Sequence, residues 1–278
     1  MSSRKPGIKV FLKHLLRRIK ESKVTDTAAQ MSYYFLLSLF PLLIFAVTLL
    51  AYLPINPQDL FNLIRDFAPG DTVQTVEDTL NEVLQNQRGG LLSFGIIATI
   101  WSASNGMNSV IKGLNYAYEV QETRPFYKAR GMSILLTIGL ILVIAAFLIL
   151  QVFGKQIGLF ASEYLGVSEQ FLTIWTWIRW LIPPLLLFAV FAGIYYFAPN
   201  LKVTYKAVIP GAIFAAVGWV LVSLGFSFYV NNFGNYSATY GSIGGIIILM
   251  IWFYLSAIII LIGGEINALM NELKGRTV

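Results

Sequence analysis

Residues 132–153 read MSILLTIGLILVIAAFLILQVF, and this stretch contains no charged side chain. A helix needs about 20 largely apolar residues to cross a hydrocarbon core about 30 Å thick, so the stretch predicts a membrane-spanning helix. Five further apolar windows of similar length are separated from it and from one another by polar breaks. The predicted spans are therefore 29–53, 91–111, 132–153, 175–197, 208–230 and 243–269.

The composition of the whole chain agrees with this prediction. Of its 278 residues, 56% are hydrophobic and 12% are charged, whereas a soluble domain carries about 25% charged residues. The chain has no cysteine and a single histidine, His14. This excludes disulfide scaffolds, thiolate or histidine metal clusters and a Ser-His-Asp triad within one chain. We therefore expect a membrane protein that is not an enzyme and that carries no metal and no cofactor.

The distribution of positive charge predicts the orientation of the spans. Most of the 20 Lys and Arg residues lie in the N-terminal tail, in the loops after the second and fourth spans, and at the C-terminus. Short cytoplasmic loops keep an excess of such residues. We expect an all-α, six-span protein of a bacterial inner membrane with both termini in the cytoplasm. Its parts would be an N-terminal segment 1–28, a transmembrane domain 29–271 and a tail 272–278.

Residues 8–20, IKVFLKHLLRRIK, predict an amphipathic helix at the membrane interface. Its apolar stripe consists of Ile8, Phe11, Leu12, Leu15 and Ile19. The basic residues on its other side are Lys9, Lys13, Arg17 and Lys20. We expect anionic lipid headgroups as its partners. Nucleic acid is not an expected partner, because Phe11 and the leucines would then face water.

Residues 54–90 form the longest polar segment and should lie outside the cytoplasm. Asn56-Pro57 is typical of a helix start, and Asp71 can cap a second helix. We expect two short amphipathic helices that form a collar over the outer end of the spans, although simple packing on the membrane surface stays open as an alternative.

Polar side chains within the spans predict a substrate-binding site near the cytoplasmic ends. Exposing amide and hydroxyl groups to acyl chains costs free energy, so we expect these side chains to line a polar cavity. Glu265 has two interpretations: it extends to the interface without a role, or it lines the cavity with Arg124 or Lys112 as partner. The candidate site residues are Tyr33, Tyr34, Asn105, Asn108, Asn115, Arg124 and Glu265.

Several segments together resemble a known family. They are AAQMSYYFLLSLFPLL in the first span, WSASNGMNSVIKGLNYAYEVQETRPFYKAR through the second span and its loop, and residues 211–268, which include Tyr240-Gly241-Ser242 and Gly264-Glu265. The chain is similar to the YihY/BrkB-like family of bacterial inner-membrane proteins, once labelled ribonuclease BN. The resemblance implies a six-span helical protein of poorly defined activity, for which envelope-lipid transport and a role in virulence have been suggested. It implies no catalytic residues.

The residues lead to two main hypotheses for the function. The first is a transporter or flippase-like protein for an amphiphilic, anionic lipid-type substrate; the alternative is a non-transporting membrane scaffold of the cell envelope. A channel is a third option, which would need charges supplied by homo-oligomerisation. A nuclease is disfavoured because the cytoplasmic acids are scattered over separate segments, and no phosphate-binding loop of the ATPase type occurs in the chain.

Overall fold

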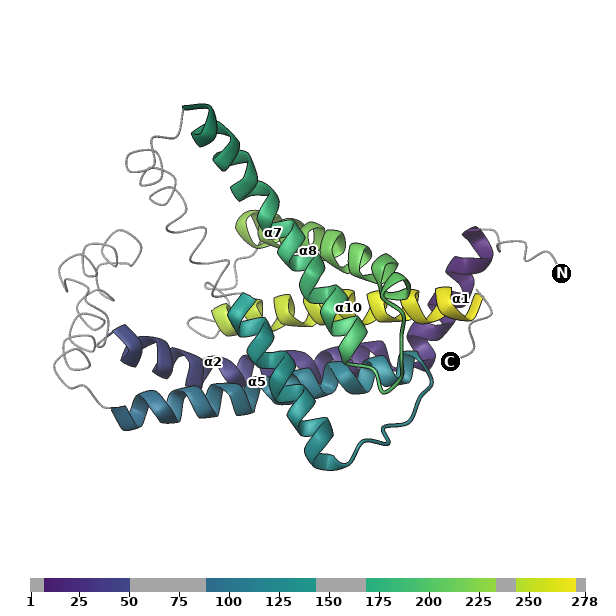
Figure 1. Ribbon diagram of the computed structural model, residues 1–278, viewed down its shortest axis with the longest axis horizontal. Helices are drawn as coiled ribbons and strands as arrows, with labels where there is room; N and C mark the ends of the chain where they lie inside the picture. Colours follow the sequence, from purple (N-terminus) through teal and green to yellow (C-terminus); the bar gives the residue numbers. More distant parts are fainter. Residues whose placement is uncertain (1–7, 51–88, 144–168, 234–243, 274–278) are drawn as a thin grey trace. The chain divides into compact units, whose positions relative to one another are not determined.

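The computed structural model describes residues 8–50, 89–143, 169–233 and 244–273, and their regular structure is entirely α-helical. The described part of each of the six predicted spans is helical, whereas residues 51–53 of the first span and 144–153 of the third lie outside the described residues. The predicted collar, 54–90, lies outside the described residues apart from its last two. The helices are α1 (Ile8–Glu21), α2 (Val24–Leu50), α5 (Gly89–Ala117), Phe126–Val143, α7 (Glu169–Phe197), α8 (Tyr205–Phe233) and α10 (Gly244–Leu273) (Figure 1).

Three of the described helices are long and apolar enough to cross a membrane: Phe126–Val143, Tyr205–Val230 and Gly244–Leu273. The segment Leu181–Phe197 is a shorter apolar helix. Leucines on two of the long helices stay exposed on the protein surface, among them Leu135 and Leu221. Large exposed apolar side chains along a helix suit contact with acyl chains rather than with water.

The chain divides into two compact units. The smaller unit comprises residues 34–103, and its described part contains most of α2 and the first half of α5. Hydroxyl groups in this unit hydrogen-bond to the backbone of their own helix. Ser38 donates to the carbonyl of Phe35 at 2.7 Å, and Thr99 donates to the carbonyl of Gly95 at 2.6 Å. Such bonds let polar side chains sit within an apolar helix without a partner from another helix.

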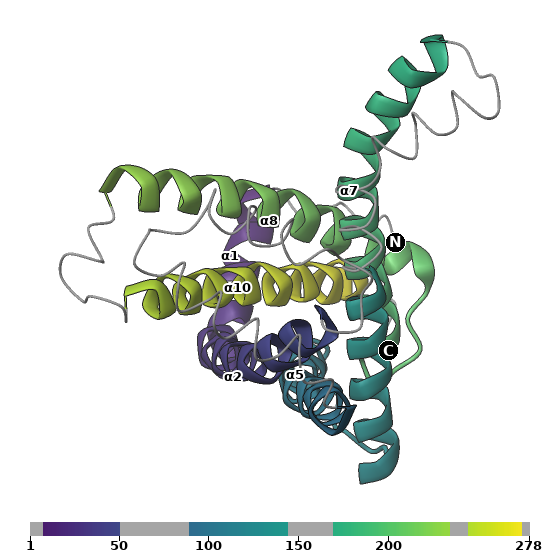
Figure 2. The same ribbon diagram turned by 90° about the vertical axis from the view of Figure 1, so that its left-hand side faces the viewer.

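In the larger unit, α8 runs alongside α10 (Figures 1 and 2), while α7 packs on α8 and α1 packs on α10. The backbones of α8 and α10 approach most closely at Gly211 and Gly263. A Cβ atom at Gly211 would collide with the carbonyl oxygen of Gly263 and would lie 2.5 Å from the Nδ2 atom of Asn267. Small residues permit such close helix packing within a membrane.

Hydrogen bonds between side chains also join α8 to α10. The indole N–H of Trp219 donates to the hydroxyl of Ser256 at 3.1 Å, and the indole N–H of Trp252 donates to the hydroxyl of Ser223 at 3.2 Å. The two indole rings meet edge to face with their centroids 5.7 Å apart. Each helix therefore supplies one indole donor and one hydroxyl acceptor, and both indole N–H groups are hydrogen-bonded within the α8–α10 contact.

Candidate functional site

The C-terminal third of α10 carries polar side chains among its buried residues. Glu265 is 1% exposed, and Gly263, Gly264 and Asn267 beside it are also buried. The two glycines leave room for neighbouring helices: the Tyr195 hydroxyl and the Leu114 side chain occupy the places that their Cβ atoms would take. Tyr195 in turn donates to the carbonyl of Ile260 at 2.6 Å. The glycines therefore allow α5 and α7 to close around α10 at the depth of the glutamate.

Arg18 of α1 is the partner of Glu265. Its Nε atom donates to one carboxylate oxygen of Glu265 at 3.1 Å, and its Nη1 atom donates to Glu272 at 2.8 Å. Nη1 also lies 3.4 Å from the carboxylate of Glu119, and Nη2 donates to the carbonyl of Ala117 at 2.5 Å. One guanidinium therefore joins α1 to the C-terminal ends of α5 and α10.

The three carboxylates around Arg18 differ sharply in their contact with water. The Glu265 side chain is 1% exposed, whereas those of Glu272 and Glu119 are 61% and 79% exposed. Water therefore screens the pairs of Arg18 with Glu272 and Glu119. In the Arg18–Glu265 pair, both the cost of removing the charges from water and the attraction between them are large. Removing Arg18 would leave Glu265 as a buried, uncompensated charge, whereas removing Glu265 would leave Arg18 with its two exposed carboxylate partners.

The local backbone places Glu119 beside Arg18. The N–H of Glu119 bonds to the carbonyl of Tyr116, and the N–H of Val120 bonds to the carbonyl of Asn115 at 3.0 Å. This is the hydrogen-bond pattern of a Schellman helix end, in which the residue at the position of Glu119 adopts a left-handed conformation. Glu119 has a φ of 55°, a conformation that costs a non-glycine residue about 1 to 2 kcal/mol. α5 therefore ends at the Arg18 cluster with a strained residue.

The buried polar atoms that have no hydrogen-bond partner among the described residues include the second carboxylate oxygen of Glu265 and the hydroxyl of Tyr118. Tyr118 is the residue between Ala117 and Glu119 at the end of α5. Burial, and secondarily the charge of Glu265, raise the pKa of the Tyr118 hydroxyl above its ordinary range. Tyr118 therefore stays neutral and can donate its proton in a hydrogen bond. One buried acceptor, on Glu265, and one buried donor, on Tyr118, are therefore available for a further hydrogen bond.

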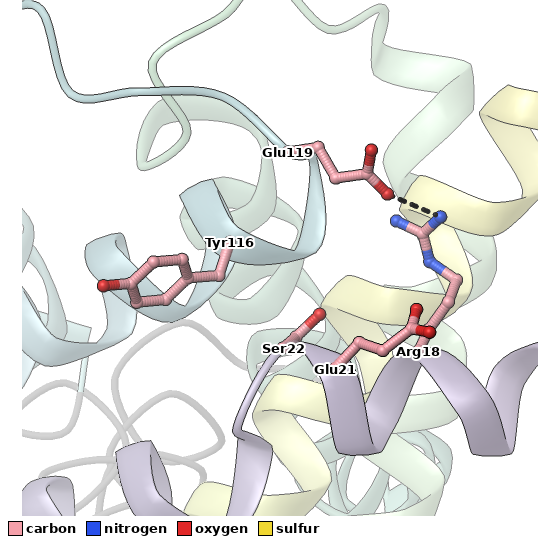
Figure 3. Close-up of a pocket in the computed structure, with 5 residues that line it drawn as sticks. All are labelled: Arg18, Glu21, Ser22, Tyr116 and Glu119. Carbon is pink, nitrogen blue, oxygen red and sulfur yellow. Dashed lines mark ion pairs between the residues drawn. The ribbon is translucent and has the colours of Figure 1, made fainter.

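A pocket of about 350 Å³ opens beside Arg18, between the ends of α1 and α5. Figure 3 shows the guanidinium reaching toward Glu119, while the ring of Tyr116 points away from it. The pocket contains more acidic than basic side chains. Its lining residues are Arg18, Glu21, Ser22, Tyr116 and Glu119.

A second polar network connects the loop after α5 with the loop after α7. The Asn115 side chain is buried; it donates to Glu122 at 3.0 Å and accepts the backbone N–H of Asn200 at 2.8 Å. Arg124 donates to both carboxylate oxygens of Glu122, at 2.8 and 2.7 Å, and to the carbonyl of Ala198 at 3.0 Å. The hydrogen bonds from Arg124 are the main reason that the pKa of Glu122 is held below its ordinary value.

The structure corrects the predicted pairing of Glu265. Its partner is Arg18, whereas Arg124 is bound to Glu122 and Lys112 is exposed. The helical spacing of the sequence did indicate a buried position for Arg18, although Arg18 was not among the predicted partners of Glu265. Leu15 lies four residues after Phe11, and Arg18 lies three residues after Leu15, so Arg18 falls on the buried side of α1 rather than on the basic side.

The remaining predicted site residues have separate surroundings. Asn105 accepts a hydrogen bond from Arg130 at 2.7 Å, and Asn108 is half-buried on the same helix. Tyr33 is exposed, with 56% of its surface accessible, in the larger unit. Tyr34 belongs to the smaller unit. In the described part of the chain, no group of three or more His, Asp or Glu side chains could hold a metal ion.

Comparison with known proteins identifies the family. Residues 15–277 match the family model described as virulence factor BrkB. The chain is 52% identical over 264 residues to the putative ribonuclease-like protein YfkH of Bacillus subtilis, covering 95% of this chain and 96% of that protein. It is 33% identical over 275 residues to a UPF0761 membrane protein of Vibrio campbellii, covering 96% and 84% respectively. No solved structure matches the chain. The chain is a membrane protein and belongs to the BrkB virulence factor family.

Proposed function

We propose that the protein is a membrane transporter or flippase-like protein for an amphiphilic, anionic lipid-type substrate, and that the Arg18–Glu265 pair closes its cytoplasmic side. The observation that carries this proposal is the burial of Glu265 in the C-terminal third of a long, largely apolar helix, against an arginine from a different segment. Ionisable residues in membrane helices are expensive, and they commonly mark pathways for substrates or protons.

The arrangement around Arg18 suits a contact that can open and close. α1 is joined to α10 and to the end of α5 through one guanidinium. Glu272 and Glu119 are largely exposed, so water can replace their contacts with Arg18 at a small cost in free energy. Separating α1 from α10 would uncover Glu265 and enlarge the pocket between α1 and α5.

The basic loop after α5 supports an anionic headgroup as the part of the substrate that is recognised. The loop and the following helix carry Arg124, Lys128 and Arg130. Arg124 binds Glu122 and Arg130 binds Asn105, while Lys128 is exposed. A phosphate or carboxylate headgroup would therefore meet Lys128 first and would compete with Glu122 for Arg124.

The test is reconstitution into proteoliposomes with fluorescent lipid analogues that carry anionic or zwitterionic headgroups. The rate at which label becomes accessible to a membrane-impermeant reductant measures transfer between leaflets. We expect the wild-type protein to accelerate transfer of the anionic analogue and Glu265→Gln to slow it severalfold. Asp26→Asn is the matched control, because it makes the same carboxylate-to-amide change at an exposed position of α2, where Thr25 donates to the carboxylate at 3.4 Å.

A transfer rate equal to that of protein-free vesicles for every analogue would overturn the transport proposal. Circular dichroism and gel filtration of each variant distinguish lost transport from lost folding. Equal slowing by Asp26→Asn and Glu265→Gln would also contradict the assigned role of the buried pair.

A membrane scaffold is the second candidate, and a specific observation favours it. Asn105 and Asn115 use their amide groups on protein partners, Arg130 in one case and Glu122 with Asn200 in the other. Polar groups that satisfy one another do not require a hydrated cavity. In a strain that lacks its own copy of the protein, a scaffold predicts that Asn105→Leu restores growth under envelope stress while deletion of 54–90 does not. A transporter predicts that Asn105→Leu fails.

A further inference from the structure

The outer face of α1 is an exposed, amphipathic surface. We define it by its exposed apolar and basic residues: Val10, Leu12, Leu16, Lys9, Lys13, Arg17 and Lys20. Leu12 is 50% exposed and Leu16 is 64% exposed. On a helix face that carries four basic side chains, large apolar side chains facing water are unfavourable.

The opposite face of α1 fixes how the helix is rotated. Leu15 and Arg18 are buried, and Arg18 is held by Glu265 and by the carbonyl of Ala117. Since α1 packs on α10 through this inner face, the outer face cannot turn toward the protein without breaking the buried ion pair. Leu15, which belonged to the predicted apolar stripe, therefore packs within the protein, whereas Leu12 of that stripe stays exposed together with Leu16.

We propose that the outer face of α1 binds an anionic lipid surface, with Leu12 and Leu16 inserted at the boundary between headgroups and acyl chains. Lysines on one helix face beside leucines are the pattern of helices that lie in such an interface. The basic side chains would meet phosphate groups, and each contributes roughly fivefold to the adsorption constant on an anionic leaflet. α1 would then bridge the lipid surface on one side and the Arg18–Glu265 pair on the other.

A lipid surface accounts for both components of this face, whereas nucleic acid accounts only for its charge. Nucleic acid binding would leave Leu12 and Leu16 facing water. The inference is independent of transport, because a helix can adsorb to a leaflet in a scaffold as well as in a transporter. A negative result in the leaflet-transfer assay would therefore leave it intact.

The absence of cysteine from the sequence makes a direct test possible. The full chain carrying Leu16→Cys is labelled with an environment-sensitive fluorophore and placed in nanodiscs of phosphatidylcholine, with or without phosphatidylglycerol. Neutral acrylamide reports contact with water, and brominated lipid reports contact with acyl chains. Gln121→Cys, on the exposed loop after α5, is the matched control.

We expect phosphatidylglycerol to shield the label at residue 16 from acrylamide severalfold and to make it sensitive to brominated lipid, with no change at residue 121. High salt should reverse this shielding, since the screening length falls to about 3 Å at 1 M. Replacing Lys9, Lys13 and Lys20 by glutamine should reverse it as well.

Three outcomes would overturn the proposal. The label at residue 16 could be as accessible to acrylamide as the label at residue 121 in both kinds of disc. It could be shielded equally with and without phosphatidylglycerol, which would remove the role of charge. It could be protected from both quenchers, which would assign the outer face to a protein partner or to a second copy of the chain.

Discussion

The Nε atom of Arg18 lies 3.1 Å from a carboxylate oxygen of Glu265, although 247 residues separate the two in sequence. The pair brings the first described helix against the last and fixes which face of α1 points inward. Because Glu265 is almost completely buried, the pair is the contact in this cluster whose loss should have the largest consequences.

Arg18→Ala is expected to lower the free energy of unfolding by about 3 to 5 kcal/mol, because it leaves Glu265 buried without a counter-charge. Arg17→Ala should change it by less than about 0.5 kcal/mol, since the exposed i,i+4 pair with Glu21 contributes little. Denaturant unfolding in detergent micelles, followed by circular dichroism, measures both.

The double variant Arg18→Met with Glu265→Leu should recover much of the stability that Arg18→Ala loses. A buried ion pair replaced by apolar side chains of similar volume is often neutral in stability, whereas half of a pair is not. If the double variant were less stable than Arg18→Ala, uncompensated charge would not be the cause of the destabilisation.

Gly211→Ala is expected to destabilise the protein by about 1 to 3 kcal/mol, because the added methyl group would overlap Gly263 and Asn267 where α8 meets α10. Gly225→Ala, on the same helix, has no atom within 4 Å of the added Cβ. It should be neutral or stabilise the helix by up to about 1 kcal/mol. Thermal unfolding of the two variants side by side makes the comparison, and equal effects would rule out close packing at Gly211 as the reason.

Asn115→Ala should loosen the connection between the loops after α5 and α7. The backbone N–H of Asn200 loses its acceptor, and a lost buried hydrogen bond costs about 1 to 3 kcal/mol. Amide hydrogen exchange at Asn200 should accelerate by roughly 5- to 150-fold, which corresponds to the same range. Gln121→Ala, in the same loop, removes an exposed side chain and should leave that exchange rate unchanged.

The Glu122–Arg124 pair should make stability depend on pH. The pKa of Glu122 lies below its ordinary value of 4.5 in the folded protein, chiefly because Arg124 donates to the carboxylate. Its contribution is therefore fully present above about pH 4.5 and is lost as the pH falls through the lower, folded-state pKa. The wild-type protein should exceed Glu122→Gln in melting temperature at pH 7.

This difference in melting temperature between the wild-type protein and Glu122→Gln should shrink as the pH falls below 4.5. Other carboxyl groups titrate in both proteins, so the difference isolates Glu122. A difference that stayed constant down to pH 3 would exclude the ionised carboxylate as its source. Both proteins are to be measured in the same detergent and at the same ionic strength.

The sequence alone predicted the positions of the apolar helices and the family of membrane proteins to which the chain belongs. The described parts of the run 132–153 and of the other apolar windows are helical. The resemblance carried by Trp101, Asn105 and Gly264-Glu265 is confirmed by the family match over 15–277. Mean hydropathy and helical periodicity depend only on residues that are close in sequence, so both can be evaluated without knowledge of the tertiary structure. The same local pattern also predicted the amphipathic helix that the structure shows as α1.

Only the tertiary structure decided which polar groups meet. It paired Glu265 with Arg18 instead of Arg124, and it joined Asn115 to Asn200, 85 residues away. It also turned Leu15 inward and left Leu16 exposed. Such choices depend on which segments the folded chain brings together and on the desolvation of particular atoms, and neither quantity is a property of any single stretch of sequence.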